Sequence, residues 1–234
     1  MSATDPFSTA IRRALPFGLL YGVHLPSVEL PMQEAWAAPL HPEERAIAKE
    51  LKAHKRISWI GGRRAIRTAM DPLNRSEDPI LSGPYGAPIM PDGLTGSISH
   101  KKTLAVAMVA RARHGTIGID LEELTPERPG IAERVLTASE LADVHALPAE
   151  RQWTSILLRF AMKEAFYKAL FPHVTRYVGF DEAIVQPALN GQVEVLPRLK
   201  DGEGPFQVEA RYYWLSEHVL CAVRLRPAPA GPEN

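Results

Sequence analysis

The chain has 234 residues, 45% of them apolar, and its 27 lysine and arginine residues balance its 27 aspartate and glutamate residues. A chain of this size can bury a core as one large domain or as two small ones. Zero net charge gives no overall attraction to nucleic acid or to an anionic membrane, so we expect neither as a partner. The single cysteine, Cys221, excludes a disulfide within the chain and a multi-cysteine zinc site, and its apolar neighbours predict a small core residue.

The first residues lack the basic-then-apolar order of a secretory signal peptide. No apolar run approaches the ~20 residues that a membrane-spanning helix needs. We therefore expect a cytoplasmic protein.

Residues 1–40 are rich in proline and predict no regular element. A helical pattern then runs from residue 42 to about residue 70. Pro42 suits the first helical position, and Glu43 and Glu44 follow where negative charge favours a helix N-terminus.

Cations gather on one face of this predicted helix at 3.6 residues per turn, namely Lys52, Arg56, Arg63 and Arg67. Such a stripe is usually a solvated face. In a chain without net charge, this cluster together with Lys55 is also a candidate binding site for one small polyanion. The cluster is too small to indicate nucleic-acid binding. The pair Gly61-Gly62 costs about 1 kcal/mol per glycine relative to alanine, so we expect a backbone or a ligand to come very close there.

Two strands are predicted in the middle of the chain. Residues 71–96 hold many prolines and glycines and predict a loop, and residues 104–109 form a continuous apolar run that is typical of a buried strand. After a polar turn at residues 111–115, apolar and other residues alternate from residue 117 to residue 122, which predicts a second strand.

The last part of the chain predicts helices followed by strands. A loop at residues 125–130 precedes a helix over residues 131–147, in which Thr137 and Glu140 suit a capping box. A strong helix follows over residues 150–170 and ends before Pro172. Further strands are predicted at residues 193–195, 206–215 and 219–225, and the end of the chain, residues 227–234, is expected to be disordered.

One pattern occurs twice. Ile98-Ser99 leads into the apolar run at 104–109, and Leu215-Ser216 leads into the apolar run at 219–225. In both places a serine-containing turn precedes an apolar strand. This is a weak hint of duplication, with two similar halves meeting near residue 113.

Asp120 and Glu122 are the first candidates for chemistry. Two positions apart on a strand, they point to the same face, while Ile119 and Leu121 point to the core. Neighbouring carboxylates repel each other unless a cation lies between them, and oxygen ligands suit magnesium, manganese or calcium. From these two residues alone, a solvated strand face is the more common explanation of the pair.

Glu164 and Lys168 lie four apart on the long helix and share a face. An ordinary surface salt bridge is the plain interpretation. However, apolar residues cover this helix nearly all round, so the helix is expected to be buried. Lys163, Glu164 and Lys168 then need partners or a polar cleft, such as one that holds a metal ion and a phosphorylated ligand.

Ser99 and His100 precede the strand at residues 104–109. Adjacent residues rarely place a nucleophile and its base correctly, and no Gly-x-Ser-x-Gly motif is present, so a hydrolase triad is not indicated. As a phosphate ligand, His100 would donate a hydrogen bond to an anion.

Taken together, these motifs resemble the 4′-phosphopantetheinyl transferase superfamily, in particular the branch of enterobactin synthetase component D and the surfactin-synthetase activator. Gly-x-Asp-x-Glu, followed some forty residues later by Lys-Glu-x-x-x-Lys and preceded by Ser-His, is a specific combination. The resemblance covers residues 42–185 well. The matching segments are residues 62–65, 85–88, 96–100, 117–122, 160–169 and 178–180.

The resemblance implies an α+β fold of two similar halves related by a pseudo-two-fold axis, with the active site at their interface. We expect an N-terminal half over residues 1–113 with the nucleotide-binding helix and loop. A C-terminal half over residues 114–226 would carry the metal-binding acids. Because the two halves would close the site within one chain, a monomer is expected.

The resemblance also assigns roles to residues. It implies magnesium, with manganese as the alternative, bound by Asp120, Glu122 and Glu164. It implies coenzyme A (CoA) as substrate, with Glu164, Lys168 and Asp120 as catalytic residues. Many relatives have a lysine in the loop where this chain has Ala87, so Lys55, Arg56 or Arg64 would have to compensate. The implied contacts to CoA are Lys55, Arg56, Arg63, Tyr85, Gly86, Ala87, Pro88, Ser99, His100, Asp120, Glu164 and Lys168.

The implied reaction moves the phosphopantetheine arm of CoA to a serine of an apo acyl or peptidyl carrier protein and releases 3′,5′-ADP. Glu164 would take the proton from the serine hydroxyl, directly or through a water, and Lys168 would stabilise the leaving group. Two alternatives stay open, namely a magnesium-dependent phosphohydrolase acting on CoA and a non-catalytic module that binds CoA or a carrier. The sequence does not choose among siderophore, polyketide, nonribosomal-peptide and fatty-acid carriers.

Overall fold

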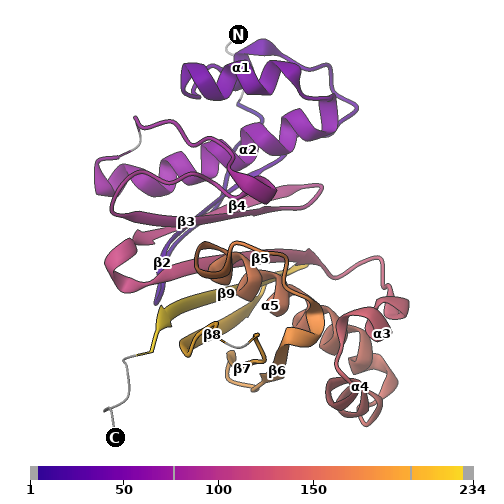
Figure 1. The fold of residues 1–234 in the computed structure, drawn as a ribbon. Coiled ribbons are helices and arrows are strands. Elements are labelled where there is room, and N and C mark those ends of the chain that lie inside the picture. The colour runs from indigo at the N-terminus through magenta and orange to yellow at the C-terminus, as the bar shows by residue number, and fades with distance from the viewer. Residues whose placement is uncertain (1–4, 76, 201, 229–234) are drawn as a thin grey trace, which may run out of the picture. The chain divides into compact units, whose positions relative to one another are not determined.

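The computed structural model describes residues 5–75, 77–200 and 202–228. The chain divides into two compact units, Met1–Arg113 and His114–Asn234. Each unit has helices packed on an antiparallel sheet (Figure 1), which confirms the expected α+β fold with two similar halves. No helix in the described part of the chain combines the length and the apolar character that crossing a membrane requires.

The first unit contains a four-stranded antiparallel sheet in the order β1-β2-β4-β3. Its strands are β1 (Thr9–Leu15), β2 (Gly18–His24), β3 (Leu94–His100) and β4 (Leu104–Arg111). β4 lies where a strand was predicted, but β3 begins inside the predicted loop of residues 71–96, and no element was predicted in residues 1–40, where β1 and β2 form a hairpin. The hairpin forms because β2 pairs along β4, from Leu19 opposite Val109 to His24 opposite Leu104.

Two helices replace the single helix expected over residues 42–70. α1 (Pro42–Glu50) and α2 (Ala53–Met70) are separated by Leu51 and Lys52, whose backbones are extended. The break lets α1 fold back onto α2, where the indole of Trp59 donates a hydrogen bond to the carbonyl of Glu44. Lys52 therefore precedes α2 and does not belong to its basic face. Short 3-10 turns complete the unit: η1 (Glu34–Ala37), η2 (Asp71–Leu73) and η3 (Pro84–Gly86).

The glycine pair of α2 lies where the helix meets the sheet. A Cβ on Gly61 would stand 2.2 Å from Cδ2 of Leu25, and one on Gly62 would stand 2.9 Å from Cγ2 of Ile98. The expectation of a close approach is therefore correct, but the approaching groups are side chains of the sheet and its flanking residues. The core between α2 and the sheet includes Ile57, Ile60, Ile66, Val23, Ala105, Ala107 and Val109.

The second unit contains a five-stranded antiparallel sheet in the order β5-β9-β8-β7-β6. Its strands are β5 (Thr116–Glu123), β6 (Ala183–Pro187), β7 (Gln192–Pro197), β8 (Phe206–Trp214) and β9 (His218–Pro227). β5, β7, β8 and β9 were predicted, whereas β6 was not, because its apolar run of Ala183 to Val185 is short. The predicted tail begins inside β9 at Pro227 and from residue 229 lies outside the described residues.

The helices of this unit are α3 (Ala132–Val135), α4 (Ala138–His145) and α5 (Ala149–Val174), with the 3-10 turns η5 (Pro129–Ile131) and η6 (Phe180–Glu182). η4 (Ala112–His114) lies at the division between the units. The predicted capping box is present, since Glu140 accepts from the Thr137 amide at 2.8 Å. The helix expected over residues 131–147 is divided just before Thr137. α5 extends past Pro172, which lies in its last turn, and ends at Val174, after which the C-cap residue Thr175 has a left-handed backbone.

Candidate functional site

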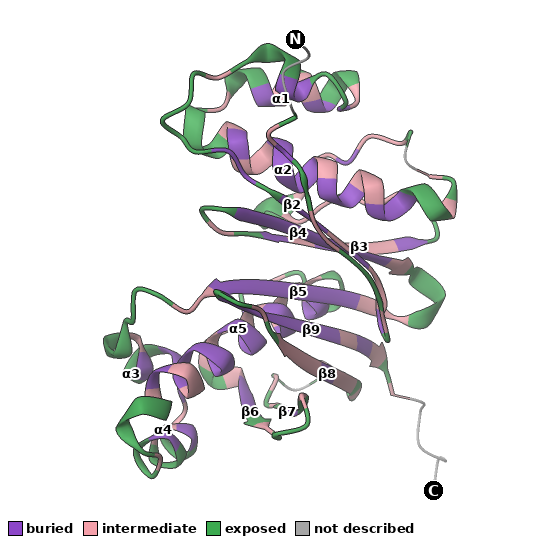
Figure 2. Cartoon of the chain, turned by 180° about the vertical axis from the view of Figure 1, so that it is seen from behind, coloured by how far each residue is buried: buried purple, intermediate pink, exposed green. Residues whose placement is uncertain are grey.

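α5 packs directly on the face of β5 that carries the two acids. Gly118 permits this contact, because a Cβ there would stand 2.0 Å from the carbonyl oxygen of Ala165 and 2.6 Å from the amide of Ala169. By strand alternation, Asp120 and Glu122 lie on the same face as Gly118. Only Ile119 and Leu121 were predicted to point to the core, but β5 is buried on both faces (Figure 2). The acids are therefore not on a solvated strand face.

Lys168 of α5 contacts Asp120 of β5. Its Nζ lies 2.7 Å from Oδ1 of Asp120 and donates to the carbonyl of Ile119 at 3.0 Å. Asp120 is 5% exposed, and the side chain of Lys168 keeps one third of its surface. The structure thus joins two residues that the sequence analysis placed in one site, and it places a cation on the first predicted metal ligand.

Arg128 lies at the other buried acid. Its Nη2 is 3.5 Å from Oε2 of Glu122, and half of the arginine side chain is exposed. Arg128 was not among the predicted site residues, because it lies in the proline-rich loop at 125–130. The sequence did offer one indication that Arg128 lies near Glu122, since it follows Glu122 by six residues in the loop that leaves the same strand.

Glu164 is half-buried on α5, one helical turn before Lys168. Across the residues that the structure describes, no three or more His, Cys, Asp or Glu side chains gather closely enough to hold a metal ion. Yet the donor chemistry suits a hard cation, because two buried carboxylates share one strand face and a lysine ammonium already lies against one of them. The metal ligation by Asp120, Glu122 and Glu164 stays a prediction.

Lys163 was expected to have either partners or a polar cleft, and the structure gives it partners. It is completely buried, and its Nζ donates to Glu140 at 2.7 Å and to the carbonyls of Val135 and Phe180 at 2.9 and 2.7 Å. Burial lowers the pKa of Lys163, while the hydrogen bond to Glu140 opposes this shift. Lys163 therefore ties α5 to α4 and to the chain after α5, and it is a structural residue.

Arg63 supports the loop that carries residues 85–88. It is 5% exposed, its Nε donates to the carbonyl of Ile80, and its Nη2 donates to Oγ of Ser82 at 3.0 Å. Ser82 pairs with Pro88 across the base of this loop, and the amide of Gly83 donates to the carbonyl of Ala87 at 2.8 Å. Burial lowers the pKa of Arg63 to about 10, so the group is still a cation at neutral pH.

The tip of this loop presents an aromatic ring. Tyr85 is 80% exposed and has a left-handed backbone with φ of 54°, and Gly86 follows with φ of 80°. A left-handed conformation is costly for a residue with a large side chain and is common at functional positions. The loop thus combines an anchored base with an exposed aromatic tip.

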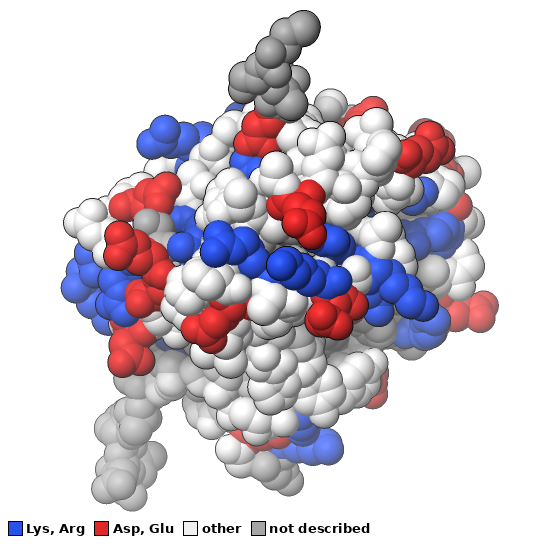
Figure 3. Space-filling model, turned by 90° about the horizontal axis from the view of Figure 1, so that it is seen from above, with Lys and Arg blue, Asp and Glu red and all other residues white. Residues whose placement is uncertain are grey.

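Other cations of α2 bind within their own unit. Arg64 pairs with Asp5, and Arg67 donates to Glu44 and to the carbonyl of Asp78 at 3.3 and 2.9 Å. Lys55 is exposed, and Arg56 is half-buried beside Arg45 and Lys49 in a hollow of about 480 Å³. Lysine and arginine side chains form a band across the face drawn in Figure 3, between groups of acids. Local basic surface therefore exists despite the zero net charge.

Ser99 and His100 end β3 and do not lie in the turn after it. Ser99 is buried and His100 is exposed. Since consecutive strand residues point to opposite faces, the two side chains diverge. They cannot act as a nucleophile and base, in agreement with the sequence analysis.

Cys221 of β9 is buried opposite Asp120 in the β5–β9 pairing. Burial, followed by the charges of Asp120 and Glu122, raises the pKa of its thiol well above the ordinary value of 9.0. The thiol is therefore protonated at neutral pH and is a core group, as expected.

Comparisons with known proteins match both units. Residues 42–110 match the family model of the 4′-phosphopantetheinyl transferase N-terminal domain, and residues 116–223 match that of the 4′-phosphopantetheinyl transferase superfamily. The chain is 36% identical over 144 residues to 4′-phosphopantetheinyl transferase PptT of Mycobacterium tuberculosis, covering 61% of this chain and 63% of that protein. It is 33% identical over 156 residues to enterobactin synthase component D of Salmonella typhimurium, covering 63% of this chain and 59% of that protein.

A shorter relative is covered more fully. Holo-[acyl-carrier-protein] synthase of Bacillus pumilus is 34% identical over 82 residues, which are 32% of this chain and 68% of that protein. The chain spans about three-fifths of the length of the larger curated relatives that it matches. The family models and these relatives agree, and the chain belongs to the 4′-phosphopantetheinyl transferase superfamily.

Proposed function

We propose that the chain transfers the 4′-phosphopantetheine arm of CoA to a serine hydroxyl of an apo acyl or peptidyl carrier protein. Family membership supports this activity. The main structural support is the contact between Lys168 and Asp120, because it joins a cation and a buried acid from the two motifs whose combination is specific.

In this proposal, residues of the first unit bind the nucleotide part of CoA. Lys55 and Arg56 supply positive charge for its phosphates, together with Ser99 and His100. The loop from Tyr85 to Pro88 contacts the base, and the exposed Tyr85 ring offers a stacking surface. Arg63 would act indirectly, because its hydrogen bonds to Ile80 and Ser82 fix the base of this loop. Ala87 has no charge, so the exposed Lys55 is expected to matter more here.

The residues of the second unit would perform the transfer. Glu164 accepts the proton of the carrier serine, whose oxygen then attacks the β-phosphorus of CoA, and the bond from that phosphorus to the 3′,5′-ADP oxygen breaks. Lys168 leaves Asp120 and donates a hydrogen bond to the phosphate of the departing 3′,5′-ADP. Asp120, Glu122 and Glu164 are the residues that would hold magnesium or manganese. When bound, the ion would neutralise charge on the pyrophosphate of CoA.

The test is to incubate the protein with CoA, magnesium and an apo carrier domain and to weigh the carrier by mass spectrometry. A mass gain equal to one phosphopantetheine group, with one 3′,5′-ADP released per carrier, is expected. Release of nucleotide without a mass gain would instead indicate a phosphohydrolase. Binding of CoA without turnover, across siderophore, polyketide, peptide and fatty-acid carriers, would indicate a non-catalytic module. Light scattering during chromatography tests the expected monomer.

A further inference from the structure

Arg159 of α5 occupies the position in the second unit that Arg63 of α2 occupies in the first. The buried acid Glu140 lies 96 positions after Glu44, and Arg159 lies the same number of positions after Arg63. Both acids accept a hydrogen bond at 2.8 Å from a distant amide, that of Ile80 in the first unit and that of Val185 in the second. The two arginines can therefore be compared within equivalent surroundings.

The hydrogen-bond partners of the two arginines differ. Arg63 donates from Nε to Ile80 and from Nη2 to Ser82, two residues farther along the chain. The residue two positions after Val185 is Pro187, whose side chain has no acceptor. Among the described residues, the Nε of Arg159 has no hydrogen-bond partner, although the residue is only 7% exposed.

The remaining contacts of Arg159 are weak or local. Its Nη1 donates to the hydroxyl of Ser155, one turn earlier on the same helix. Its Nη2 lies 4.0 Å from Oδ2 of Asp143, whose side chain is 63% exposed. Burial lowers the pKa of Arg159, and the charges of Glu140 and Asp143 only partly oppose this shift. The positive charge and the N–H donors on the Nε–Nη2 edge of the guanidinium are therefore only partly matched by acceptors.

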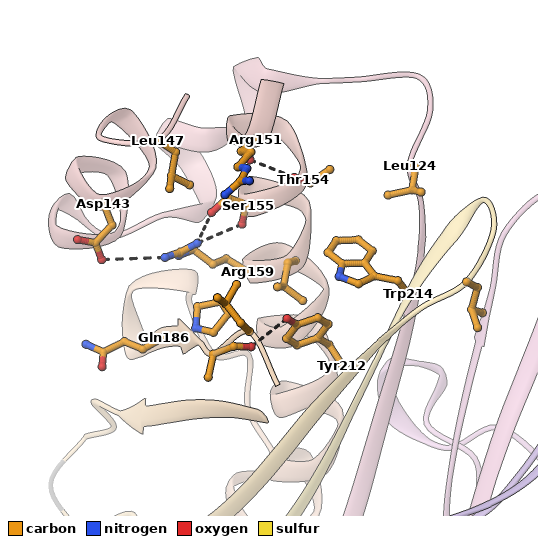
Figure 4. A pocket seen from close by; sticks show the side chains of 15 residues that line it. Leu124, Asp143, Leu147, Arg151, Thr154, Ser155, Arg159, Gln186, Tyr212 and Trp214 are labelled. Carbon is orange, nitrogen blue, oxygen red and sulfur yellow. Dashed lines mark hydrogen bonds and ion pairs between the residues drawn. The ribbon is translucent and has the colours of Figure 1, made fainter. Parts of the chain in front are cut away.

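A pocket of about 800 Å³ opens beside this arginine (Figure 4). Its walls come from α4, α5, β8 and the β6–β7 turn, and they are mostly apolar. Trp214 remains 47% exposed and Leu189 at the β6–β7 turn is fully exposed. A volume of this size suits one small molecule, and exposed large apolar side chains around a concave site are typical of a ligand-binding surface.

We propose that this pocket binds an amphipathic carboxylate, with the carboxylate on the Nε–Nη2 edge of Arg159 and an aliphatic or aromatic body against Leu124, Leu158 and Trp214. Guanidinium and carboxylate match as a two-pronged pair, and such charge-assisted hydrogen bonds are strong where water is excluded. A single negative charge fits, because a polyphosphate would leave further charges against apolar walls. Asp143 holds the edge only at long range, so an incoming carboxylate competes with it.

The site is separate from the proposed transfer site, because its residues are not among those assigned to CoA, metal or carrier serine. Its occupancy is therefore measured as binding to the full chain, without CoA or carrier. The probes are decanoate and 1-decanol, which share an apolar chain and differ in the head group, both titrated calorimetrically below their aggregation limits. We expect decanoate to bind at least about tenfold more tightly than decanol, the gain of a hydrogen-bonded ion pair.

Variants separate this model from nonspecific apolar binding. Asp143→Asn, a surface change, should tighten decanoate about threefold and leave decanol unchanged, because it removes the competing carboxylate. Arg159→Met should reduce the affinity for decanoate to that for decanol, and Trp214→Ala should weaken both. Arg134→Met, at an exposed arginine of α3, is the control and should change neither. Equal affinities of the two probes for the unmodified chain, or no response of decanoate to Asp143→Asn, would overturn the proposal.

Discussion

Glu44 in α1 and Glu140 in α4 make the same two contacts in their own units. Each accepts a hydrogen bond from the residue that caps its helix, and each pairs with a cation of the longest helix of its unit, α2 or α5. Glu44 accepts from the His41 amide at 3.0 Å and pairs with Arg67 at 3.3 Å. Glu140 accepts from the Thr137 amide at 2.8 Å and pairs with Lys163 at 2.7 Å. Lys163 lies 96 positions after Arg67, the same interval that separates the two acids. The repeated contact supports an origin of the two units by duplication.

The two ion pairs should contribute unequally to stability. Lys163 and Glu140 are both fully buried, so Glu140→Gln leaves an uncompensated buried ammonium and should cost about 3–5 kcal/mol of unfolding free energy. Arg67 keeps some exposure and also donates to Asp78, so Glu44→Gln should cost about 1–3 kcal/mol. Urea unfolding of both variants checks this order. A larger loss for Glu44→Gln would contradict it.

The contact of Gly118 with α5 should tolerate no side chain. Gly118→Ala would place Cβ against backbone atoms of Ala165 and Ala169, which cannot move aside as a flexible side chain can. We expect a loss of about 3 kcal/mol or more in unfolding free energy. Gly130→Ala is the matched control, because nothing lies within 4 Å of its Cβ position, and it should leave stability nearly unchanged. Equal stability of the two variants in urea would rule out the tight contact.

Glu164→Gln tests the proposed base. The variant should lose transfer to the carrier by about a hundredfold or more, because the amide cannot accept the serine proton, while CoA still binds at least partly. Mass spectrometry of the carrier measures transfer, and calorimetry measures CoA binding. Glu133→Gln, at an exposed residue of α3, should retain full transfer. Undiminished transfer by Glu164→Gln would remove this residue from the role of base.

Lys168 and a divalent ion should compete for Asp120. Lys168→Met removes the ammonium that lies 2.7 Å from Oδ1 of Asp120, so manganese should bind at least about threefold more tightly in the absence of CoA. Transfer should fall at the same time, because the departing phosphate loses a donor. Paramagnetic resonance of free manganese measures binding, and Lys200→Met, at an exposed lysine, is the control. Weaker manganese binding by Lys168→Met would argue against a shared carboxylate.

Cys221 should be unreactive in the folded chain. Since burial raises the pKa of its thiol, Ellman's reagent at pH 8 should label it only after unfolding in urea. The raised pKa also contributes stability that is fully present below about pH 9 and is lost as pH rises, because the unfolded thiol ionises first. The unfolding free energy should thus fall more steeply above pH 9 in the unmodified chain than in Cys221→Ala, by up to about 1.4 kcal/mol per pH unit. Identical slopes, or rapid labelling of the folded chain, would show an accessible thiol.

Local patterns predicted the elements whose stability is local. The apolar run at 104–109, the alternation at 117–122 and the capping box of Thr137 and Glu140 all form as expected. The serine-containing pattern found twice marks equivalent hairpins, closed by Lys101 donating to Leu104 at 2.8 Å and Leu215 donating to His218 at 2.8 Å.

Long-range partners escaped the sequence analysis because nothing in spacing or periodicity encodes them. The β1–β2 hairpin depends on pairing with β4, about eighty residues away. Lys163 was expected to have either partners or a polar cleft, and its partner Glu140 was not identified because it lies 23 residues earlier, in another helix. Arg63 belonged to a basic face that was interpreted either as solvated or as a site for a small polyanion, but its acceptors lie beyond α2 in the segment from Ile80 to Ser82.

The absence of a side chain at Gly118 also limits how the second unit can move. Backbone atoms of α5 press on β5 there, so α5 cannot slide or roll along the strand without a steric clash. Rearrangement around Asp120 and Glu122 is therefore expected in side chains that keep exposed surface, namely Lys168, one third exposed, and Arg128, half exposed. Asp120 and Glu122 are thus held on a strand that α5 keeps in place, and the cations beside them are the side chains of Lys168 and Arg128.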